Sequence, residues 1–394
     1  MPAIILGKSA TALYAIRELG REGVNVFVEN SSDNFTKHSK YAQAVKSSIT
    51  INSDNDRVEY LLNDFPVSEQ NKGVLIACSD QDIDFIYNNV EKLSTKYLIQ
   101  NSIQDGSATT IMDKEGLLKL CIENDIAIPA CWTKNKAQLN SLIKDIEFPC
   151  IIKPTLIHEV KTLMAGRKLW VAKNSTEYEN IIDNLPEGNT EWIIQEMIPG
   201  PESEIWLYSA FFDSESNPHH AFTARKLRQY PPGFGSASLV CSAENNELKD
   251  ISEKFFNNIG FKGIGAAEFK RDPRDGKLKM IEINPRPSLW FGVSTAANKY
   301  ITTCAYKDAK GQPLPTDQVQ LNGVFWRYWL KDLFSIAFYS LNKKFILPSP
   351  NFKGAPKKVK AATPVFVIND IKPSLVELLQ LTKKAISRLS KGNR

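Results

Sequence analysis

The stretch "IGAAEFKRDPRDGKLKMIEINPR", residues 264–286, contains two apolar runs on either side of a turn signal. The Asp-Gly dipeptide at 275–276 is typical of tight turns between antiparallel strands, so the stretch predicts a β-hairpin. Folding the chain at this dipeptide places Glu268 opposite Glu282. Asn284 shares their side of the hairpin, because side chains alternate along a strand.

Two carboxylates that face each other across a hairpin repel unless a divalent cation lies between them. Two carboxylates and one amide suit Mg²⁺, which is usually bound by few protein ligands together with substrate phosphates. Glu268, Glu282 and Asn284 are therefore predicted metal ligands, and Arg286 would add positive charge beside the phosphates. The alternative is a solvent-exposed hairpin face that carries three polar side chains and no metal.

The length of 394 residues is too great for one ordinary core and predicts two or three domains. With 42% apolar and 24% charged residues, the composition is that of a soluble globular protein. We find no apolar run of about 18 residues and no basic-then-apolar leader, which argues against a spanning helix or a secretory signal. The six cysteines are scattered, so we expect buried, reduced thiols in a cytoplasmic protein.

The net charge of +5 conceals an asymmetry along the chain. Residues 342–394 carry 12 Lys and Arg against two acids, so the preceding body is mildly acidic. A basic tail of this kind can meet an anionic surface, and the alternative is a solvated, mobile end. No nucleic acid partner is predicted, and the oligomeric state stays open.

The N-terminal part alternates strands and helices. A short apolar run at 3–7, a helical pattern at 9–23 and an alternating run at 24–29 predict a doubly wound parallel sheet. Neither a P-loop nor a dinucleotide fingerprint fits, because glycine is missing at the required positions. Glu29 ends the second strand, where a ribose-binding acid could stand, so a dinucleotide site stays open as a minor alternative.

Two further stretches carry charged residues where apolar strands end. "FPCIIKP" (148–154) ends in Lys153, and a lysine there is costly unless it points at an anion. "EWIIQEMIPGPESEIWLYSAFF" (191–212) predicts two strands separated by a Pro-Gly-Pro turn, with a cluster of carboxylates around the turn.

Three blocks in a fixed order carry a resemblance to a known family: "QEMIPGPESE" (195–204), "FTARKLRQYPPGFGSASL" (222–239) and the hairpin quoted above. The chain resembles the ATP-grasp superfamily, and more closely the bacterial carboxylate–amine ligase group that includes D-aspartate ligases. The resemblance covers residue 1 to about 310. It implies an α/β ATP-grasp fold with an N-terminal Rossmann-like (pre-ATP-grasp) domain, a C-terminal α/β extension, and ATP in the cleft between two ATP-grasp subdomains.

The resemblance also implies domain limits. The predicted ranges are 1–112 for the Rossmann-like domain, 113–194 for the lysine-bearing subdomain, 195–310 for the subdomain that bears the carboxylates and the metal, and 311–394 for the basic C-terminal extension.

The resemblance implies which residues bind ATP. Two lysines stand where the family's phosphate-binding lysines stand, four residues stand at the hinge that binds adenine, and one acid follows the hinge as the ribose ligand. These are Lys114 and Lys153 for the phosphates, Gln195, Glu196, Met197 and Ile198 for adenine, and Glu202 for ribose with Glu204 as the alternative.

The resemblance assigns further roles to basic residues and carboxylates. Arg225, Lys226 and Arg228 resemble the basic residues that approach the phosphates and the acyl phosphate. Glu268, Glu282 and Asn284 match the family's Mg²⁺ ligands, and Arg286 matches the arginine that steadies the transferred phosphoryl group.

One segment departs from the family pattern. ATP-grasp proteins generally follow the second lysine with a loop rich in glycine and serine, whereas residues 153–170 offer only one glycine. Charged side chains are therefore expected to contact the phosphates in place of backbone amides. The candidates are His158, Lys161, Arg167 and Lys168, although a solvated loop histidine is the simpler reading of His158.

The resemblance implies an ATP-dependent carbon–nitrogen ligase that uses ATP and Mg²⁺. A substrate carboxylate attacks the γ-phosphate, and an amine then attacks the acyl phosphate to give an amide, ADP and phosphate. Small carboxylates and amines of the amino-acid or sugar-acid type are the implied substrates, with a cell-envelope precursor or polysaccharide as one candidate. The alternatives are another ATP-grasp reaction, such as carboxylation or phosphotransfer, and a non-catalytic nucleotide-binding module.

The C-terminal extension contains two helical patterns. Residues 323–344 are rich in aromatics, and Arg327, Lys331 and Ser335 form a narrow polar stripe at a spacing of four. This pattern fits a helix on a membrane surface, at the inner face of the membrane, or a helix packed on the body of the protein. The second pattern, 374–389, predicts a helix with Leu375, Leu378, Leu379 and Ala385 as candidates for its buried face.

Overall fold

The computed structural model describes residues 1–155, 169–188 and 190–391. These residues form two compact units. The first contains residues 1–126, 201–269 and 282–394, and the second contains residues 127–200 and 270–281. The four domain ranges predicted from the sequence remain a prediction.

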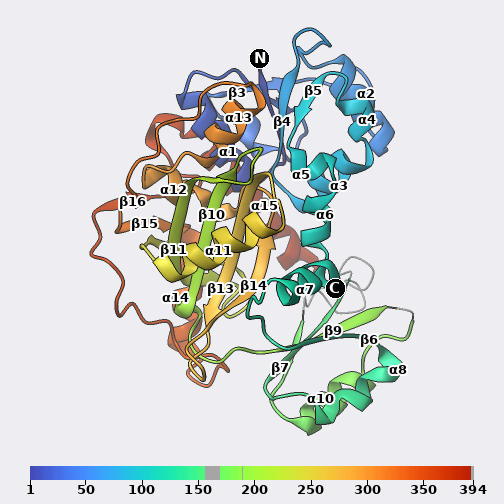
Figure 1. Cartoon of the computed structure of the whole chain (residues 1–394), viewed down its shortest axis with the longest axis vertical. Coiled ribbons are helices and arrows are strands. Elements are labelled where there is room, and N and C mark those ends of the chain that lie inside the picture. The colour runs from blue at the N-terminus through green and yellow to red at the C-terminus, as the bar shows by residue number, and fades with distance from the viewer. Residues whose placement is uncertain (156–168, 189, 392–394) are drawn as a thin grey trace. The chain divides into compact units, whose positions relative to one another are not determined.

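A parallel sheet with the strand order β3-β2-β1-β4-β5 opens the first unit (Figure 1). This is the Rossmann strand order 3-2-1-4-5, without a sixth strand in the described residues, so the predicted doubly wound sheet is confirmed. Strands β1 and β4 are buried at every position, as expected where helices cover both faces of a parallel sheet. The strands are β1 (Ala3–Leu6), β2 (Val26–Glu29), β3 (Ala42–Val45), β4 (Gly73–Ala77) and β5 (Tyr97–Ile99).

Hydroxyl and carboxylate side chains begin several of the helices around this sheet. Ser9, Ser53 and Asp113 each accept a hydrogen bond from a backbone N–H in the first turn of the helix that follows. Such caps satisfy amide groups that have no partner within the helix. The helices are α1 (Ala10–Arg21), η1 (Phe35–His38), α2 (Asp54–Asn63), α3 (Asp80–Asn88), α4 (Val90–Leu93), α5 (Asn101–Gln104), α6 (Ser107–Met112) and α7 (Lys114–Glu123).

A second sheet of the first unit has the order β14-β13-β10-β11-β12-β15-β16. It contains the hairpin predicted from residues 264–286, and Gly276 in its turn has a φ of +73°, which favours glycine. In Figure 1, β10, β11, β13 and β14 lie side by side. The strands are β10 (Ile205–Phe212), β11 (Pro218–Tyr230), β12 (Ser236–Ser242), β13 (Gly263–Arg271), β14 (Leu278–Asn284), β15 (Val324–Arg327) and β16 (Lys360–Ala362).

Both faces of this sheet are covered. The ring of Phe256 stacks on Tyr208, and the ring of Trp290 stacks on Phe222, each at 6.3 Å between centroids. Tyr208 pairs with Thr223, the neighbour of Phe222 on β11, so the two stacks lie on opposite faces. The covering elements are α11 (Asn246–Asn258), η4 (Leu289–Phe291), α12 (Gly292–Ala296) and α13 (Ile301–Ala309).

The C-terminal extension differs from its prediction in two ways. The pattern over 323–344 predicts one helix, but its first part is β15, which pairs with β12, and only α14 (Trp329–Leu341) is helical. The second helix, α15 (Lys372–Lys391), forms after η5 (Ile368–Asp370), but the predicted buried face is wrong. Val376 packs on the core instead, while Leu375, Leu378 and Leu379 are exposed; the side chain of Ala385 lies outside the described residues.

The second unit contains a four-stranded antiparallel sheet in the order β6-β9-β7-β8. Helices pack on it through a core that includes Tyr178, Ile182 and Trp192. The elements are β6 (Cys131–Asn135), α8 (Lys136–Leu139), η2 (Asn140–Lys144), β7 (Cys150–Pro154), β8 (Trp170–Ala172), α10 (Ser175–Asp183) and β9 (Glu191–Glu196). Across the described part of the chain, we find no helix with the length and apolar character needed to span a membrane.

Candidate active site

A buried ion pair lies at the centre of the candidate site. Lys226 on β11 contacts Glu268 on β13, with side chains 4% and 9% exposed. Burial raises the pKa of Glu268, the charge of Lys226 lowers it and the charge of Glu282 raises it, so that the pKa lies above its usual range. Glu282 lies on β14, which neighbours β13 in the sheet, as the hairpin predicts.

The other two predicted metal ligands are in direct contact. Asn284 Nδ2 donates a hydrogen bond to Glu282 Oε1 at 3.0 Å, which leaves the Asn284 amide oxygen for another partner. Asn284 is buried and Glu282 is exposed. The described residues contain no metal-binding group of three or more His, Cys, Asp and Glu, but two carboxylates and one amide do not need such a group. This oxygen donor set fits a Mg²⁺ ion.

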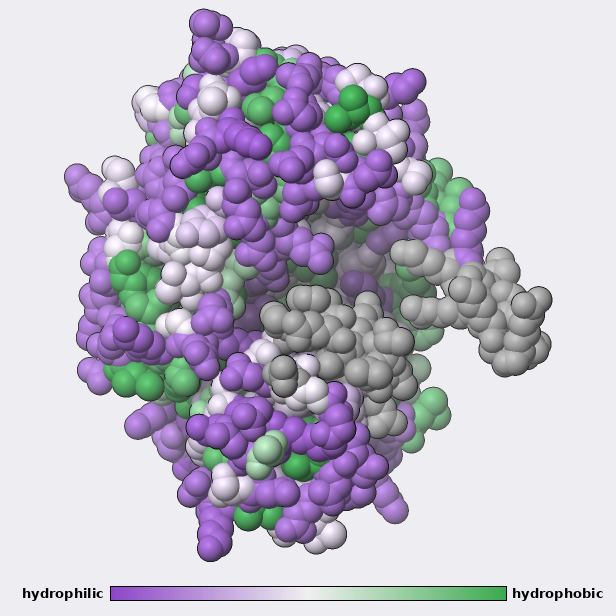
Figure 2. Space-filling model, turned by 90° about the vertical axis from the view of Figure 1, so that its right-hand side faces the viewer, coloured by the Kyte–Doolittle hydropathy of each residue, from purple (hydrophilic) through white to green (hydrophobic). Residues whose placement is uncertain are grey.

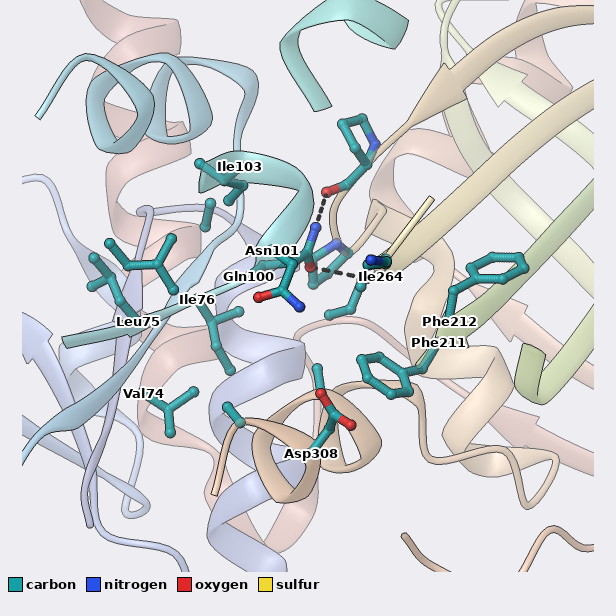
Figure 3. Close-up of a pocket in the computed structure, with 18 of the residues that line it drawn as sticks. Val74, Leu75, Ile76, Gln100, Asn101, Ile103, Phe211, Phe212, Ile264 and Asp308 are labelled. Atoms are coloured by element: carbon teal, nitrogen blue, oxygen red, sulfur yellow. Dashed lines mark hydrogen bonds between the residues drawn. The ribbon is translucent and has the colours of Figure 1, made fainter. Parts of the chain in front are cut away.

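The hairpin is fastened to the N-terminal sheet by Gln100. Its Oε1 accepts from the Ile264 N–H at 2.9 Å and its Nε2 donates to the Pro285 carbonyl at 3.3 Å (Figure 3). Gln100 therefore holds the start of β13 and the residue that follows Asn284. The cavity beside Gln100 measures about 70 Å³, whereas small-molecule sites occupy about 300–1,000 Å³, so it is not a nucleotide site.

Arg286 is also tied to the N-terminal sheet. Its Nε donates to Asp80 Oδ1 at 2.7 Å, and its Nη1 donates to the Pro287 carbonyl at 3.1 Å. Asp80 is the first residue of α3, directly after β4. Arg286 therefore lies beyond the carboxyl end of β14, close to the predicted metal ligands in sequence and fixed by an acid of the Rossmann-like sheet.

The three basic residues predicted to approach the phosphates do not lie together. Lys226 pairs with Val240, whereas Arg225 and Arg228 pair with Cys241 and Leu239, which point to the other face of the sheet. A register shift after Lys226 places Arg228 on the same face as Arg225. Of the three, only Lys226 shares a face with the metal set.

Both arginines have structural partners on their own face. Arg225 pairs with Glu204 at 2.8 Å and donates to the Lys353 carbonyl at 2.6 Å. Arg228 holds the buried carboxylate of Asp332 with two hydrogen bonds of 2.6 and 2.8 Å. In this structure Arg225 and Arg228 fasten the C-terminal extension to the sheet, which does not support their predicted phosphate role; that role remains a prediction.

Glu202, the preferred ribose ligand in the sequence, is fully buried in η3 (Glu202–Glu204). Its two oxygens accept from the N–H groups of Gln229 at 3.0 Å and Gly233 at 2.9 Å. Burial raises the pKa of Glu202, and these two N–H groups oppose the rise. A carboxylate in this position holds the loop after β11 and is not exposed to a ribose. The side chain of its alternative Glu204 is 31% exposed and pairs with Arg225, and its ribose role remains a prediction.

In the second unit, two predicted ATP ligands meet. Lys153 Nζ on β7 donates to Gln195 Oε1 on β9 at 2.8 Å. The Glu196 carboxylate has a structural role, since it accepts from the Ala130 N–H at 3.0 Å and pairs with Arg274.

Part of the backbone of the predicted adenine-binding hinge forms hydrogen bonds within the protein. The Met197 N–H donates to the Pro149 carbonyl at 3.1 Å, and the Ile198 carbonyl accepts from Lys270 Nζ at 2.7 Å. For the Ile198 N–H, no hydrogen-bond partner is found in the described ranges. An N–H group of this kind can bind a ring nitrogen of a nucleobase.

Comparison with known proteins shows what the chain is similar to in sequence. No family model matches the sequence. The chain is 25% identical over 225 residues to D-aspartate ligase from Enterococcus faecium (strain Aus0004), covering 55% of this chain and 53% of that protein. It is 26% identical over 147 residues to D-alanine–D-alanine ligase from Wolbachia sp. subsp. Drosophila simulans (strain wRi), covering 36% and 44%. The chain thus spans about half the length of the curated relatives it matches.

The fold is decided by a solved structure. Carboxyaminoimidazole ribonucleotide synthase from Aspergillus clavatus, complexed with ATP, superposes with a TM-score of 0.60 at 13% identity, covering 82% of this chain and 80% of that chain. The chain has an ATP-grasp fold. In sequence it is similar to ligases, and its similarity to D-aspartate ligase agrees with the predicted resemblance.

Two further predictions concern residues that would contact the ATP phosphates. Lys114 is the first residue of α7, directly after the capping residue Asp113. The charged residues predicted to cover the phosphates, His158, Lys161, Arg167 and Lys168, lie outside the described residues.

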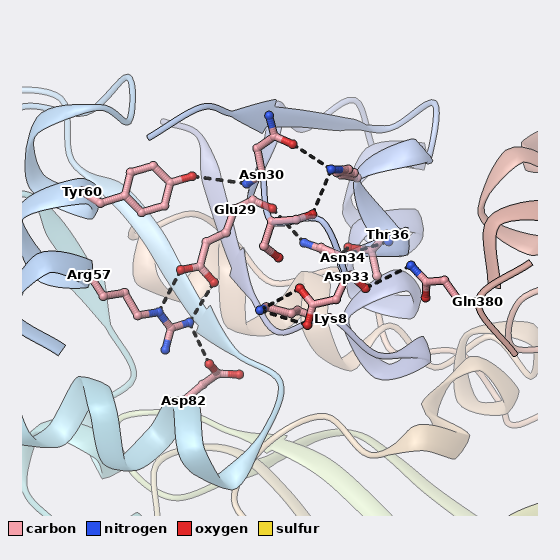
Figure 4. Close-up of polar contacts among 12 residues, drawn as sticks. Lys8, Glu29, Asn30, Asp33, Asn34, Thr36, Arg57, Tyr60, Asp82 and Gln380 are labelled. Carbon is pink, nitrogen blue, oxygen red and sulfur yellow. Dashed lines mark hydrogen bonds and ion pairs between the residues drawn. The ribbon is translucent and has the colours of Figure 1, made fainter. Parts of the chain in front are cut away.

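The minor dinucleotide alternative is disfavoured by the contacts of Glu29 (Figure 4). Both of its oxygens accept from Arg57 at 2.8 Å, and Arg57 also pairs with Asp82 at 3.0 Å. A carboxylate held in this way is not presented to a ribose. Arg57 and Gln100 were not accessible to sequence reasoning, because their partners are 25 to 185 residues away and belong to no motif.

Proposed function

We propose that this ATP-grasp protein is an ATP-dependent carboxylate–amine ligase that forms an amide through an acyl phosphate. The observation that carries the proposal is the group formed by Lys226, Glu268, Glu282 and Asn284, one cation beside three oxygen donors on one hairpin. A non-catalytic nucleotide-binding module would have no use for two carboxylates kept close together at a cost in electrostatic repulsion.

The proposed nucleotide contacts come from the residues that the family resemblance selects. Lys114 and Lys153 bind the phosphates, and Glu204 binds the ribose. The N–H of Ile198 and the side chain of Gln195 bind adenine, while Glu196 and Met197 shape the hinge. The contact of Lys153 with Gln195 and the partial exposure of Glu204 support this assignment.

Glu268, Glu282 and Asn284 would hold Mg²⁺. When bound, the ion would neutralise negative charge on the transferred phosphoryl group. Binding requires Glu268 to be ionised and to exchange its contact with Lys226 for the ion, which frees the Lys226 ammonium for a phosphate oxygen. Arg286 would steady the transferred group from the end of β14.

The proposed reaction has two steps. An oxygen of the substrate carboxylate forms a bond to the γ-phosphorus of ATP as the bond to the β-phosphate oxygen breaks, and ADP leaves. The amine nitrogen then attacks the acyl carbon, the carbon–oxygen bond to phosphate breaks, and the amine proton passes to the departing phosphate or to water. Catalysis is mainly positioning and charge stabilisation, as in other phosphoryl transfers.

The substrates are proposed as a small carboxylate and an amine of the amino-acid or sugar-acid type, with a cell-envelope precursor or polysaccharide as a candidate acceptor. The sequence relatives, named for ligation of D-aspartate and D-alanine, support this class. A cytoplasmic location is part of the proposal, and the six free cysteines are compatible with it.

The test is a screen of amino acids and acidic cell-envelope precursors for ADP release by the purified chain with ATP and Mg²⁺. The expected result is release that needs one carboxylic acid, and that yields a hydroxamate when hydroxylamine replaces the amine. ADP release stimulated by bicarbonate alone would assign carboxylation, and release without hydroxamate for every stimulating acid would assign phosphotransfer. For variants that remove a charge from the site, the matched control is Glu91→Gln, because Glu91 is an exposed acid on α4.

A further inference from the structure

Helix α14 packs on the protein with its polar side. The three residues that it buries are Asp332, Ser335 and Tyr339, spaced three and four apart on one face. Asp332 is fully buried and accepts hydrogen bonds from Arg228 and Arg327. These arginines belong to β11 and β15, so the polar face of the helix is anchored to the sheet.

The opposite face of α14 is apolar and exposed. Apart from Ser340, every exposed residue of the helix is apolar. The large ones are between 37% and 82% exposed: Trp329, Leu330, Leu333, Phe334, Ile336 and Leu341. A helix on a protein surface normally buries its apolar stripe and exposes its charged face, so the arrangement here is reversed.

Cations flank this apolar face at both ends. Lys343 and Lys344 follow the helix directly and are exposed. At the other end, the Arg327 guanidinium lies over the Trp329 ring at 4.1 Å, beside a 260 Å³ pocket that Lys358 also lines. Residues 333–369 contain six exposed lysines and no Asp or Glu.

The charges around the apolar face of α14 indicate which kind of partner surface could cover it. Two copies of the chain that met through it would bring their lysines together, which like-charge repulsion opposes. A helix of 13 residues is about 20 Å long, less than the roughly 30 Å of a bilayer's hydrocarbon core, so it cannot cross a membrane. An apolar face flanked by cations matches the interface of an anionic bilayer, where apolar side chains enter the acyl region and lysines meet the headgroups.

The second C-terminal helix also exposes apolar side chains. Leu375, Leu378 and Leu379 of α15 are exposed, while Glu377 accepts a hydrogen bond from the Tyr328 hydroxyl, directly before α14. The two helices therefore begin next to each other. By contrast, the face drawn in Figure 2 is mostly hydrophilic, and its hydrophobic residues form small separate patches.

We propose that α14 docks the protein on the surface of an anionic lipid bilayer, with its apolar face in the interface and Lys343 and Lys344 at the headgroups. This inference is independent of the proposed ligase activity, because α14 lies against the face of the sheet opposite to Lys226 and Glu268. The expected binding is weak and reversible, since it combines one short helix with a few lysines.

The test is flotation of the full chain with vesicles of phosphatidylcholine alone or with phosphatidylglycerol, at about 50 mM and about 500 mM salt. We expect flotation with the anionic vesicles at low salt, and release at high salt. Leu333→Ser with Phe334→Ser should weaken binding by at least about tenfold, because both side chains are exposed and would enter the interface. Lys343→Gln with Lys344→Gln should also weaken it by about tenfold and reduce its salt dependence.

The control is Ile122→Ser with Val319→Ser, two exposed apolar residues outside the C-terminal helices, which should leave flotation unchanged. Point variants are preferred to truncation, because β15 is part of the sheet. Three results would overturn the proposal: a full chain that stays in solution with anionic vesicles at low salt, equal losses in the serine pair and the control pair, or a dimer abolished by the serine pair without vesicle binding. A dimer lost in this way would show that the apolar face of α14 binds a second copy of the chain.

Discussion

Lys226 and Glu268 are each other's partner inside the seven-stranded sheet. A buried carboxylate and a buried ammonium stabilise one another when no other ligand is present, and removing either leaves an unpaired charge in a medium of low dielectric. In the proposed ligase the two groups would separate: Glu268 would hold Mg²⁺ and Lys226 would contact a phosphate oxygen. The pair would then link metal binding to phosphate binding.

The first prediction concerns the pH dependence of Mg²⁺ binding. Since the charge of Lys226 lowers the pKa of Glu268, Lys226→Met should raise that pKa further. Protons compete with the metal for the carboxylate, so the Mg²⁺ affinity of the variant should fall further below that of the wild type as the pH is lowered. Calorimetric titration with Mg²⁺ in the presence of ADP at several pH values measures the difference in affinity, and parallel pH profiles would contradict the prediction.

The second prediction concerns Glu282, which is exposed and can be changed without opening the core. Glu282→Gln keeps an oxygen for the Asn284 amide but removes a charge, so turnover should fall by about 10²–10³. The melting temperature should stay within the range of the Glu91→Gln control. ADP formation at saturating ATP is the measurement, and unchanged turnover would remove Glu282 from the metal site.

The third prediction separates Arg228 from the active site. Arg228→Lys cannot keep both hydrogen bonds to the buried Asp332, so unfolding should need about 1–3 kcal/mol less free energy. The KM for ATP should change by less than about twofold, because Arg228 lies on the other face of the sheet from Lys226. Urea unfolding and steady-state kinetics give the two values. A large increase in KM with unchanged stability would restore the phosphate role of Arg228.

The fourth prediction concerns Asp370, which joins the C-terminal extension to the N-terminal sheet. Its carboxylate pairs with the buried Arg17 at 2.8 Å and accepts from Ser39 and the Lys40 N–H, each at 2.8 Å. Burial alone would raise its pKa, but the Lys40 N–H, Arg17 and Ser39 outweigh burial and hold the pKa below its usual range.

A carboxyl group with a lowered pKa contributes stability above its unfolded pKa, about 3.9, and loses it as pH falls through the folded value. Asp370→Asn should therefore cost about 3 kcal/mol at neutral pH and progressively less below about pH 4. Urea unfolding at several pH values measures the difference. A cost that does not vary with pH would show that the charge of Asp370 is not what stabilises the extension.

The parts of the fold that could be predicted are those with a local signal. The Asp-Gly turn and the alternation around it locate the hairpin of Glu268 and Glu282, and alternating strands and helices predict the parallel sheet. Strand β15 could not be predicted, because its four residues run into a helical pattern with no turn or breaker residue between them. Periodicity shows that α14 has a polar and an apolar side, but only the arginines on β11 and β15 decide that Asp332 faces inward.

In the candidate site, too, only features with a local sequence signal could be predicted. The grouping of Glu268, Glu282 and Asn284 could be predicted because the three residues belong to one hairpin, and their role as metal ligands remains a prediction. The separation of Arg225 and Arg228 from Lys226 could not, since it depends on a register shift that leaves no trace in residue types. Glu202 was predicted as a ribose ligand because it follows the hinge as the resemblance implies, whereas its backbone partners Gln229 and Gly233 become visible only in three dimensions.

The most direct test of the ligase proposal traces the carboxylate oxygen atoms of the substrate acid into the phosphate product. The carboxylic acid that stimulates ADP release is labelled with ¹⁸O in its carboxylate, and the phosphate formed with the amine present is analysed by mass spectrometry. If an acyl phosphate forms and the amine displaces phosphate from its carbon, each phosphate should carry one oxygen from the acid. Phosphate without the label, formed together with the amide, would contradict the mechanism, because the carboxylate oxygen would then never have been bonded to phosphorus.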